Sequence, residues 1–144
     1  MKMKIKFLWL TLFCMVLTSC GTNEAKHSTA PETGTYKVAI LYPGGENKTF
    51  DMDYYENKHM PMMAKLLGDN LRFYEIDKGI SGRTGGDRAS FVTMGYFYID
   101  DVEEYNEVIA RNMDTIRNDI PQYTNIQPII QISEIRQWKS GHTK

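Results

Sequence analysis

The sequence predicts an α+β domain of the ferredoxin-like class, with its elements in the order βαββαβ. Four segments are rich in β-branched and aromatic residues and are bounded by turn residues, as strands are. Two other segments carry apolar residues at intervals of three and four, as amphipathic helices do. Their order along the chain predicts a four-stranded antiparallel sheet with two helices on one face.

The expected strands follow from local signals, and the first three end at or directly before Pro43, Gly79 and Asp100. They cover residues 35–42, 71–79, 90–99 and 128–138. Between the second and third lies GISGRTGGDR, residues 79–88, with four glycines and two arginines. A phosphate-binding loop would end in Lys-Ser/Thr and precede a helix, so we expect a mobile hairpin loop instead.

The first expected helix is capped by Thr49 or Asp51 and ends near Leu67. The second is capped by Asp100 or Asp101 and runs without interruption to Ile120, where Pro121 ends it. Their apolar faces consist of Met52, Tyr55, His59, Met62, Met63 and Leu66 in the first, and of Val102, Tyr105, Ile109, Met113, Ile116 and Ile120 in the second.

The third strand indicates that both faces of the sheet are covered. One side carries Phe91, Phe97 and Ile99, and the other carries Val92, Met94, Tyr96 and Tyr98. Neither side is polar, although two helices can cover only one face. We therefore expect a second copy of the chain on the other face, in a homodimer, and the sequence is compatible with either side facing the helices.

His59 occupies an apolar position of the first expected helix, and Pro61 follows two residues later. Because proline has no N–H, the carbonyl of Asn57 loses its partner and the helix should kink, opening a cleft beside the imidazole. Two interpretations fit this position. Either His59 is a buried histidine satisfied by hydrogen bonds, or it acts as a general acid/base in the cleft.

The first 19 residues have the features of a bacterial lipoprotein signal peptide. Three lysines precede an apolar run at residues 7–17 that is too short to span a bilayer comfortably. The following Leu-Thr-Ser-Cys resembles a lipobox, so we expect lipidation at Cys20 and a location at the membrane of the cell envelope, outside the cytoplasm. The alternatives are a secreted protein cut near Ser19 or an uncleaved anchor. Residues 20–34 are expected to form a flexible tether and residues 35–139 the domain.

Composition limits the classes of partner and cofactor. The 17 basic and 18 acidic residues give a net charge of −1, and removal of residues 1–19 takes away three lysines and no acid, which leaves −4. This balance, without a basic cluster, argues against a nucleic-acid partner. The sequence has no metal-ligand spacing and no dinucleotide-binding fingerprint, so no metal site is expected and the cofactor stays undefined.

Two long stretches resemble the EthD family, named for a role in ethyl tert-butyl ether degradation. They are YPGGENKTFDMDYYENKHMPMM and EVIARNMDTIRNDIPQYTNIQPIIQISEI, and the likeness covers residues 38–138. The resemblance implies a dimeric α+β barrel in which two sheets pack face to face. The family's aromatic–x₃–His–x–Pro helix matches Tyr55, His59 and Pro61. The family is commonly associated with reductase or other oxidoreductase activity, and relatives in the wider superfamily, isomerases among them, bind small, often aromatic compounds in the cleft between helices and sheet.

Two functions follow as hypotheses. In the first, the protein is an oxidoreductase or isomerase with His59 as general acid/base, near its unperturbed pKa, and with Tyr55 or Tyr123 orienting the ring. In the second, it is a membrane-tethered protein that binds a small hydrophobic compound without turnover. The sequence shows no second catalytic group paired with His59, which favours binding.

Overall fold

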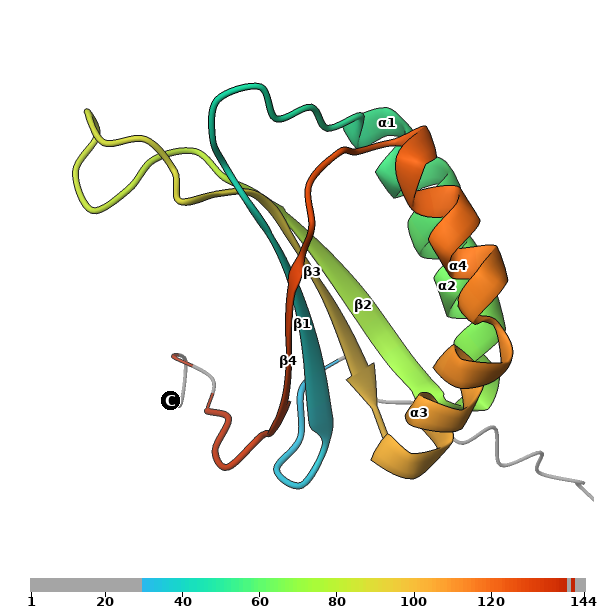
Figure 1. Ribbon diagram of the computed structural model, residues 1–144. Helices are drawn as coiled ribbons and strands as arrows, with labels where there is room; N and C mark the ends of the chain where they lie inside the picture. Colours follow the sequence, from blue (N-terminus) through green and yellow to red (C-terminus); the bar gives the residue numbers. More distant parts are fainter. Residues whose placement is uncertain (1–29, 140, 142–144) are drawn as a thin grey trace, which may run out of the picture.

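The computed structural model describes residues 30–139 and 141. They form two layers, an antiparallel sheet and a layer of helices along one of its faces (Figure 1). This arrangement confirms the predicted α+β, ferredoxin-like fold class. The predicted signal peptide and Cys20 lie outside the described residues, and within the described part no helix is long and apolar enough to cross a membrane.

The four strands are antiparallel and lie in the order β2-β3-β1-β4. Their bounds are Tyr36–Pro43 for β1, Leu71–Lys78 for β2, Phe91–Ile99 for β3 and Ile129–Glu134 for β4. β4 is an edge strand and is shorter than the predicted span of residues 128–138, because its pairing with β1 ends at Glu134.

The first helical segment is composite. It consists of α1 (Met52–Tyr54), a π-helical turn (Tyr55–His59), α2 (Met60–Leu67) and a 3₁₀ turn (Gly68–Asn70). The predicted cap is present, because the Asp51 side chain accepts a hydrogen bond from the N–H of Tyr54. In the π turn the N–H of Met60 donates to the carbonyl of Tyr55, directly before Pro61. The ladder is therefore disturbed where the sequence predicts, but as a wider turn.

The prediction of one uninterrupted second helix is wrong. α3 (Val102–Arg111) and α4 (Met113–Asp119) are separate, and a 3₁₀ turn (Ile120–Gln122) follows α4. The Asn112 side-chain amide donates to the carbonyl of Val108, and the Asn112 backbone leaves helical geometry at φ −112° and ψ 14°. The carbonyl of Val108 thus accepts from both the backbone N–H and the side-chain amide of Asn112 at the point where α3 ends.

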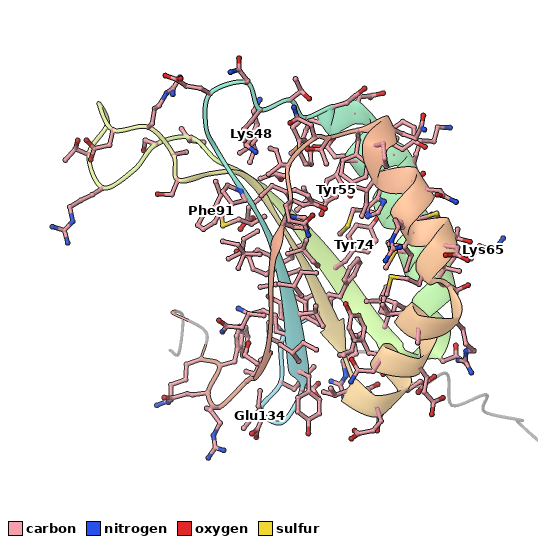
Figure 2. All side chains as sticks on the ribbon, in the orientation of Figure 1. Lys48, Tyr55, Lys65, Tyr74, Phe91 and Glu134 are labelled. Atoms are coloured by element: carbon pink, nitrogen blue, oxygen red, sulfur yellow. The ribbon has the colours of Figure 1, made fainter. Side chains whose placement is uncertain are left out.

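The core lies between the helices and the sheet, and Figure 2 shows Tyr55 pointing into this space. Phe97 and Ile99 of β3 are buried there, which decides which side of the third strand faces the helices. Alternation along β3 places Tyr96 on the opposite, open face. The buried residues of this core cluster are Val38, Ile40, Tyr42, Tyr55, Met60, Met63, Leu67, Phe97, Ile99, Tyr105, Val108, Tyr123 and Ile126.

The open face of the sheet carries aromatic and charged side chains together. Phe73 stacks on Tyr98 with ring centroids 4.1 Å apart, and the Tyr98 hydroxyl donates to Glu75 over 2.7 Å. The Lys37 ammonium lies 5.2 Å from the centroid of the Tyr96 ring. The open face thus has aromatic side chains along β3, with the negative Glu75 on the neighbouring β2 and the positive Lys37 on the neighbouring β1.

Two connections border the sheet. Residues 79–90 join β2 to β3 and extend beyond the sheet without helix or strand, as expected of a hairpin loop (Figure 1). Residues that precede β1 lie on the fold, since the N–H of Gly34 donates to the carbonyl of Ile135 and Glu32 pairs with Arg72. The end of the predicted tether is thus bound to the domain.

Candidate functional site

A cavity of about 200 Å³ lies between the helices and the β1–β4 side of the sheet; we call it the His59 cavity. Among the described residues that line it there is no lysine, arginine, aspartate or glutamate. The lining residues are Ile40, Tyr42, Tyr55, His59, Met60, Met63, Phe97, Tyr105, Ile109, Met113, Ile116, Ile120, Tyr123, Gln127, Pro128 and Ile130. A cleft beside His59 is therefore present, and the structure brings the three predicted site residues together in it.

His59 is the last residue of the π turn and is only 6% exposed. Its Nδ1 lies 2.7 Å from Oδ2 of Asp119, and its Nε2 lies 3.3 Å from the hydroxyl of Tyr123. A carboxylate can only accept, so the neutral ring donates its Nδ1–H to Asp119. This assignment leaves the lone pair of Nε2 on the side of Tyr123 and the cavity.

Asp119 was not anticipated from the sequence. It is the last residue of α4 and accepts a second hydrogen bond, from the Tyr54 hydroxyl over 2.8 Å. The expectation that no second group is paired with His59 is therefore wrong. A local signal exists in hindsight: Asp119 lies three residues after Ile116 and one before Ile120, beside the apolar stripe of its helix.

The tyrosine hydroxyls form a chain that ends at the imidazole. Tyr123 contacts Nε2 of His59, and its hydroxyl lies 2.8 Å from that of Tyr42, which is hydrogen bonded in turn with Tyr55. Tyr55 itself stacks on the His59 ring, with centroids 5.5 Å apart and planes at 16°. Of the two tyrosines expected to orient the ring, Tyr123 contacts it through a hydrogen bond and Tyr55 through stacking.

Gly95 of β3 makes room for Tyr55. A Cβ built on Gly95 would lie 2.2 Å from the Tyr55 hydroxyl, far inside van der Waals contact. Any side chain at this position would therefore push Tyr55 away from Tyr42 and from the ring of His59.

Burial sets the protonation states at the site. It lowers the pKa of His59 below its usual value of 6.5, and the hydrogen bond with Asp119 offsets part of that shift. The expectation of an unperturbed imidazole is therefore wrong. Burial also raises the pKa of Tyr42, Tyr55 and Tyr123 well above the usual range, so all three hydroxyls stay protonated near neutral pH. The site holds a neutral base beside hydroxyl donors.

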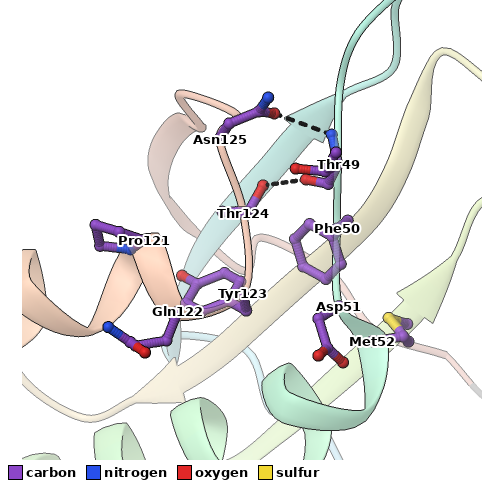
Figure 3. A pocket seen from close by; sticks show the side chains of 9 residues that line it. All are labelled: Thr49, Phe50, Asp51, Met52, Pro121, Gln122, Tyr123, Thr124 and Asn125. Atoms are coloured by element: carbon purple, nitrogen blue, oxygen red, sulfur yellow. Dashed lines mark hydrogen bonds between the residues drawn. The ribbon is translucent and has the colours of Figure 1, made fainter.

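A second, wider depression opens on the surface next to Tyr123 and lacks both His59 and Asp119 (Figure 3). One wall is the loop before α1 with the first residue of α1, and the other is the 3₁₀ turn at residues 120–122 with the loop after it. The N–H of Thr49 donates to the Asn125 side chain, and the Thr124 hydroxyl donates to the carbonyl of Thr49. These bonds clamp the two loops together and thereby fix Tyr123 in the wall of the His59 cavity. Within the described part of the chain, no three His, Cys, Asp or Glu side chains group as metal ligands would.

Known structures resemble this one, whereas no protein-family model and no curated protein matches the chain. The crystal structure of an EthD-like protein from Ralstonia eutropha JMP134 is 35% identical, with a TM-score of 0.72, over 77% of this chain and 100% of that one. The chain belongs to the EthD family. An EthD family protein from Bacillus halodurans C-125 shares the fold at 20% identity and a TM-score of 0.54, over 69% of this chain and 97% of its own. The family assignment made from the two sequence stretches is thus confirmed.

Proposed function

We propose that this EthD family protein is an enzyme that transfers a proton on a small apolar carbonyl compound bound in the His59 cavity. The observation that carries the proposal is the 2.7 Å contact between Asp119 and Nδ1 of His59. It holds a neutral imidazole with its Nε2 lone pair at the polar end of an otherwise apolar cavity. A base positioned in this way, and oriented by a carboxylate, is suited to proton abstraction near neutral pH.

The reaction needs only this chain and the bound compound. Nε2 of His59 takes a proton from the carbon next to the carbonyl group, and the electron pair of that C–H bond moves onto the carbonyl oxygen. The Tyr123 hydroxyl donates a hydrogen bond to the oxygen as its charge develops. Asp119 stabilises the imidazolium, which then returns the proton to the oxygen and yields an enol, or, where a C=C bond is conjugated with the enolate, returns it to the far carbon of that bond and yields an isomer. The oxidoreductase activity implied by the resemblance stays a prediction.

Deuterium exchange provides a test with a defined compound. The probe is 2-tetralone, a two-ring ketone whose protons next to the carbonyl exchange in D₂O and are followed by proton NMR. We expect His59→Gln to slow the protein-catalysed exchange by about a hundredfold or more, because glutamine hydrogen bonds but does not act as a base. Equal exchange by both proteins, at equal thermal stability, would refute the proposal. Tight binding of the ketone without any catalysed exchange would support the alternative, a binding protein without turnover.

The proposal includes a membrane-tethered homodimer. A second copy on the open face would cover Tyr96 and its aromatic neighbours, and the charges of Lys37 and Glu75 on that face can pair across a two-fold axis. Lipidation at Cys20 would hold the dimer to the membrane of the cell envelope. Cys20→Ser should then release the folded protein from the membrane fraction, and sedimentation with membranes would contradict lipidation as the anchor.

A further inference from the structure

The size of the His59 cavity limits its ligand. The volume of the cavity is about 200 Å³. It is smaller than the roughly 300 Å³ at which pockets for drug-sized ligands begin. The cavity therefore fits a molecule of one or two fused rings. Its entrance is apolar on two sides, since Met113 is 40% and Ile130 58% exposed.

The charges around the cavity disfavour an anion. The described lining residues include no cation, and the nearest carboxylate to His59, that of Asp119, is turned towards the imidazole. A bound carboxylate would lose its water without gaining a counter-ion and would be repelled by Asp119. A cation would in turn have to enter past methionine and isoleucine side chains. The electrostatics favour an uncharged ligand.

The hydrogen-bonding groups at the polar end require a ligand that both donates and accepts. Nε2 of His59 is an acceptor, and its present contact with the Tyr123 hydroxyl is long at 3.3 Å. The Tyr123 hydroxyl can donate to a ligand once it turns away from Nε2. Its single proton is then used, so in the 2.8 Å contact between the two hydroxyls Tyr42 has to be the donor. A ligand hydroxyl satisfies both groups at once, because it donates to Nε2 and accepts from Tyr123. A ketone or an ether can only accept and leaves Nε2 unsatisfied.

We infer that the His59 cavity selects a neutral one- or two-ring molecule with a weakly acidic hydroxyl, an enol or a phenol, and rejects the carboxylate of the same shape. The inference rests on the proposed function and names the ligand class of the same cavity. The proposed proton transfer converts a ketone into its enol. The site is therefore expected to bind the enol more tightly than the ketone.

Three probes of one shape test the selection. They are 2-naphthol, which donates and accepts, 2-methoxynaphthalene, which only accepts, and 2-naphthoate, which is anionic at neutral pH. Titration calorimetry of the purified protein should show 2-naphthol binding about tenfold or more tightly than either of the others, because only its hydroxyl satisfies both polar groups. NMR signals of the His59 ring should shift with 2-naphthol.

Two matched variants separate the contribution of Asp119 from a general loss of negative charge. Asp119→Asn removes the carboxylate behind His59, so the preference for 2-naphthol over 2-naphthoate should fall by about fivefold or more. Asp114→Asn removes an exposed carboxylate of the same helix that does not line the cavity, and it should leave the preference unchanged.

The outcomes distinguish this inference from the proposed function. If 2-naphthoate binds the wild type as tightly as 2-naphthol does, the selection is refuted, whereas proton transfer to and from 2-tetralone can still be observed. If 2-methoxynaphthalene binds as tightly, the hydroxyl is not recognised and the inference fails in the same way. If none of the three probes binds, the inference fails, and the 2-tetralone exchange assay then decides separately whether the proposed function also fails.

Discussion

The two faces of the sheet are both rich in tyrosine, but they use it differently. On the helix-covered face, the hydroxyls of Tyr42 and Tyr123 bond to each other and lead to His59. On the open face, the Tyr98 hydroxyl bonds to a carboxylate of the neighbouring strand, and Lys37 lies over the ring of Tyr96. On the covered face, Tyr42 and Tyr123 are buried, and their hydroxyls hydrogen bond to each other and to the His59 imidazole. The open face keeps its polar partners at the rim, as a surface that packs against another protein does.

Adjacent residues of β3 give the largest contrast between the faces. Phe97 is 3% exposed and faces the helices, so Phe97→Asp buries an unpaired charge and should destabilise the fold by more than about 4 kcal/mol. Tyr96 points to the open face, so Tyr96→Asp should give a folded monomer. Circular dichroism melts and light scattering measure both effects. If light scattering gives the mass of a monomer for the wild-type protein, the open face is not a dimer interface and the proposal of a homodimer is refuted.

Gly95 precedes both residues in β3 and lies on the helix-covered face, where a side chain would meet Tyr55. Gly95→Ala places a methyl group against the Tyr55 hydroxyl, which must move away from Tyr42. We expect a loss of about 1–3 kcal/mol of stability, as for overpacked cores, together with weaker binding of 2-naphthol. Thermal melts and calorimetry provide the measurement. Unchanged stability would contradict this prediction, because it would show that Tyr55 can move aside without losing packing contacts.

The sequence predicts the scaffold well because its signals are local. The apolar period of α2, the Asp51 and Asp101 caps and the turn residues around the strands act within a few positions of one another. The break between α3 and α4 escapes prediction because the apolar stripe continues past Asn112, whereas the break lies in the backbone geometry of that residue.

The candidate site is predicted only in part. His59 stands out because a polar ring occupies an apolar helical position, and Tyr55 lies one turn before it. Asp119 does not stand out, since its contact with His59 joins residues 60 positions apart and depends on how α4 packs beside the π turn. Likewise, the lowered pKa of His59 follows from burial in the folded chain and from no pattern of residues.

The protonation of His59 should be visible in the pH dependence of folding. Because the pKa of His59 is lowered by burial, the unfolded chain binds a proton more readily than the folded one just below pH 6.5. Stability should therefore fall as the pH drops below 6.5, until the folded protein also becomes protonated. Urea unfolding at several pH values should show a smaller slope in this window for His59→Gln. An equal slope in both proteins would assign the pH dependence to other groups.

Substitution of Tyr54 should have the smallest effect of these changes, and it tests how the Asp119 carboxylate is held beside His59. Its hydroxyl donates to Oδ1 of Asp119 while His59 donates to Oδ2, so Tyr54 holds the carboxylate in the orientation that the imidazole requires. Tyr54→Phe removes that single hydrogen bond at a partly exposed position and should change the melting temperature only slightly.

The effect of Tyr54→Phe on His59 is more specific than its effect on stability. Without the Tyr54 hydroxyl, Asp119 can turn towards solvent, and the bond that offsets the burial of His59 is weakened. The pKa of His59, followed by NMR of its ring, should then fall further below 6.5, and 2-tetralone exchange should slow with little change in the affinity for 2-naphthol. Asp119→Asn should lower the pKa of His59 more strongly in the same titration. If Tyr54→Phe leaves the pKa of His59 unchanged, Asp119 keeps its orientation without Tyr54, and the pairing with His59 depends on the packing of α4 alone.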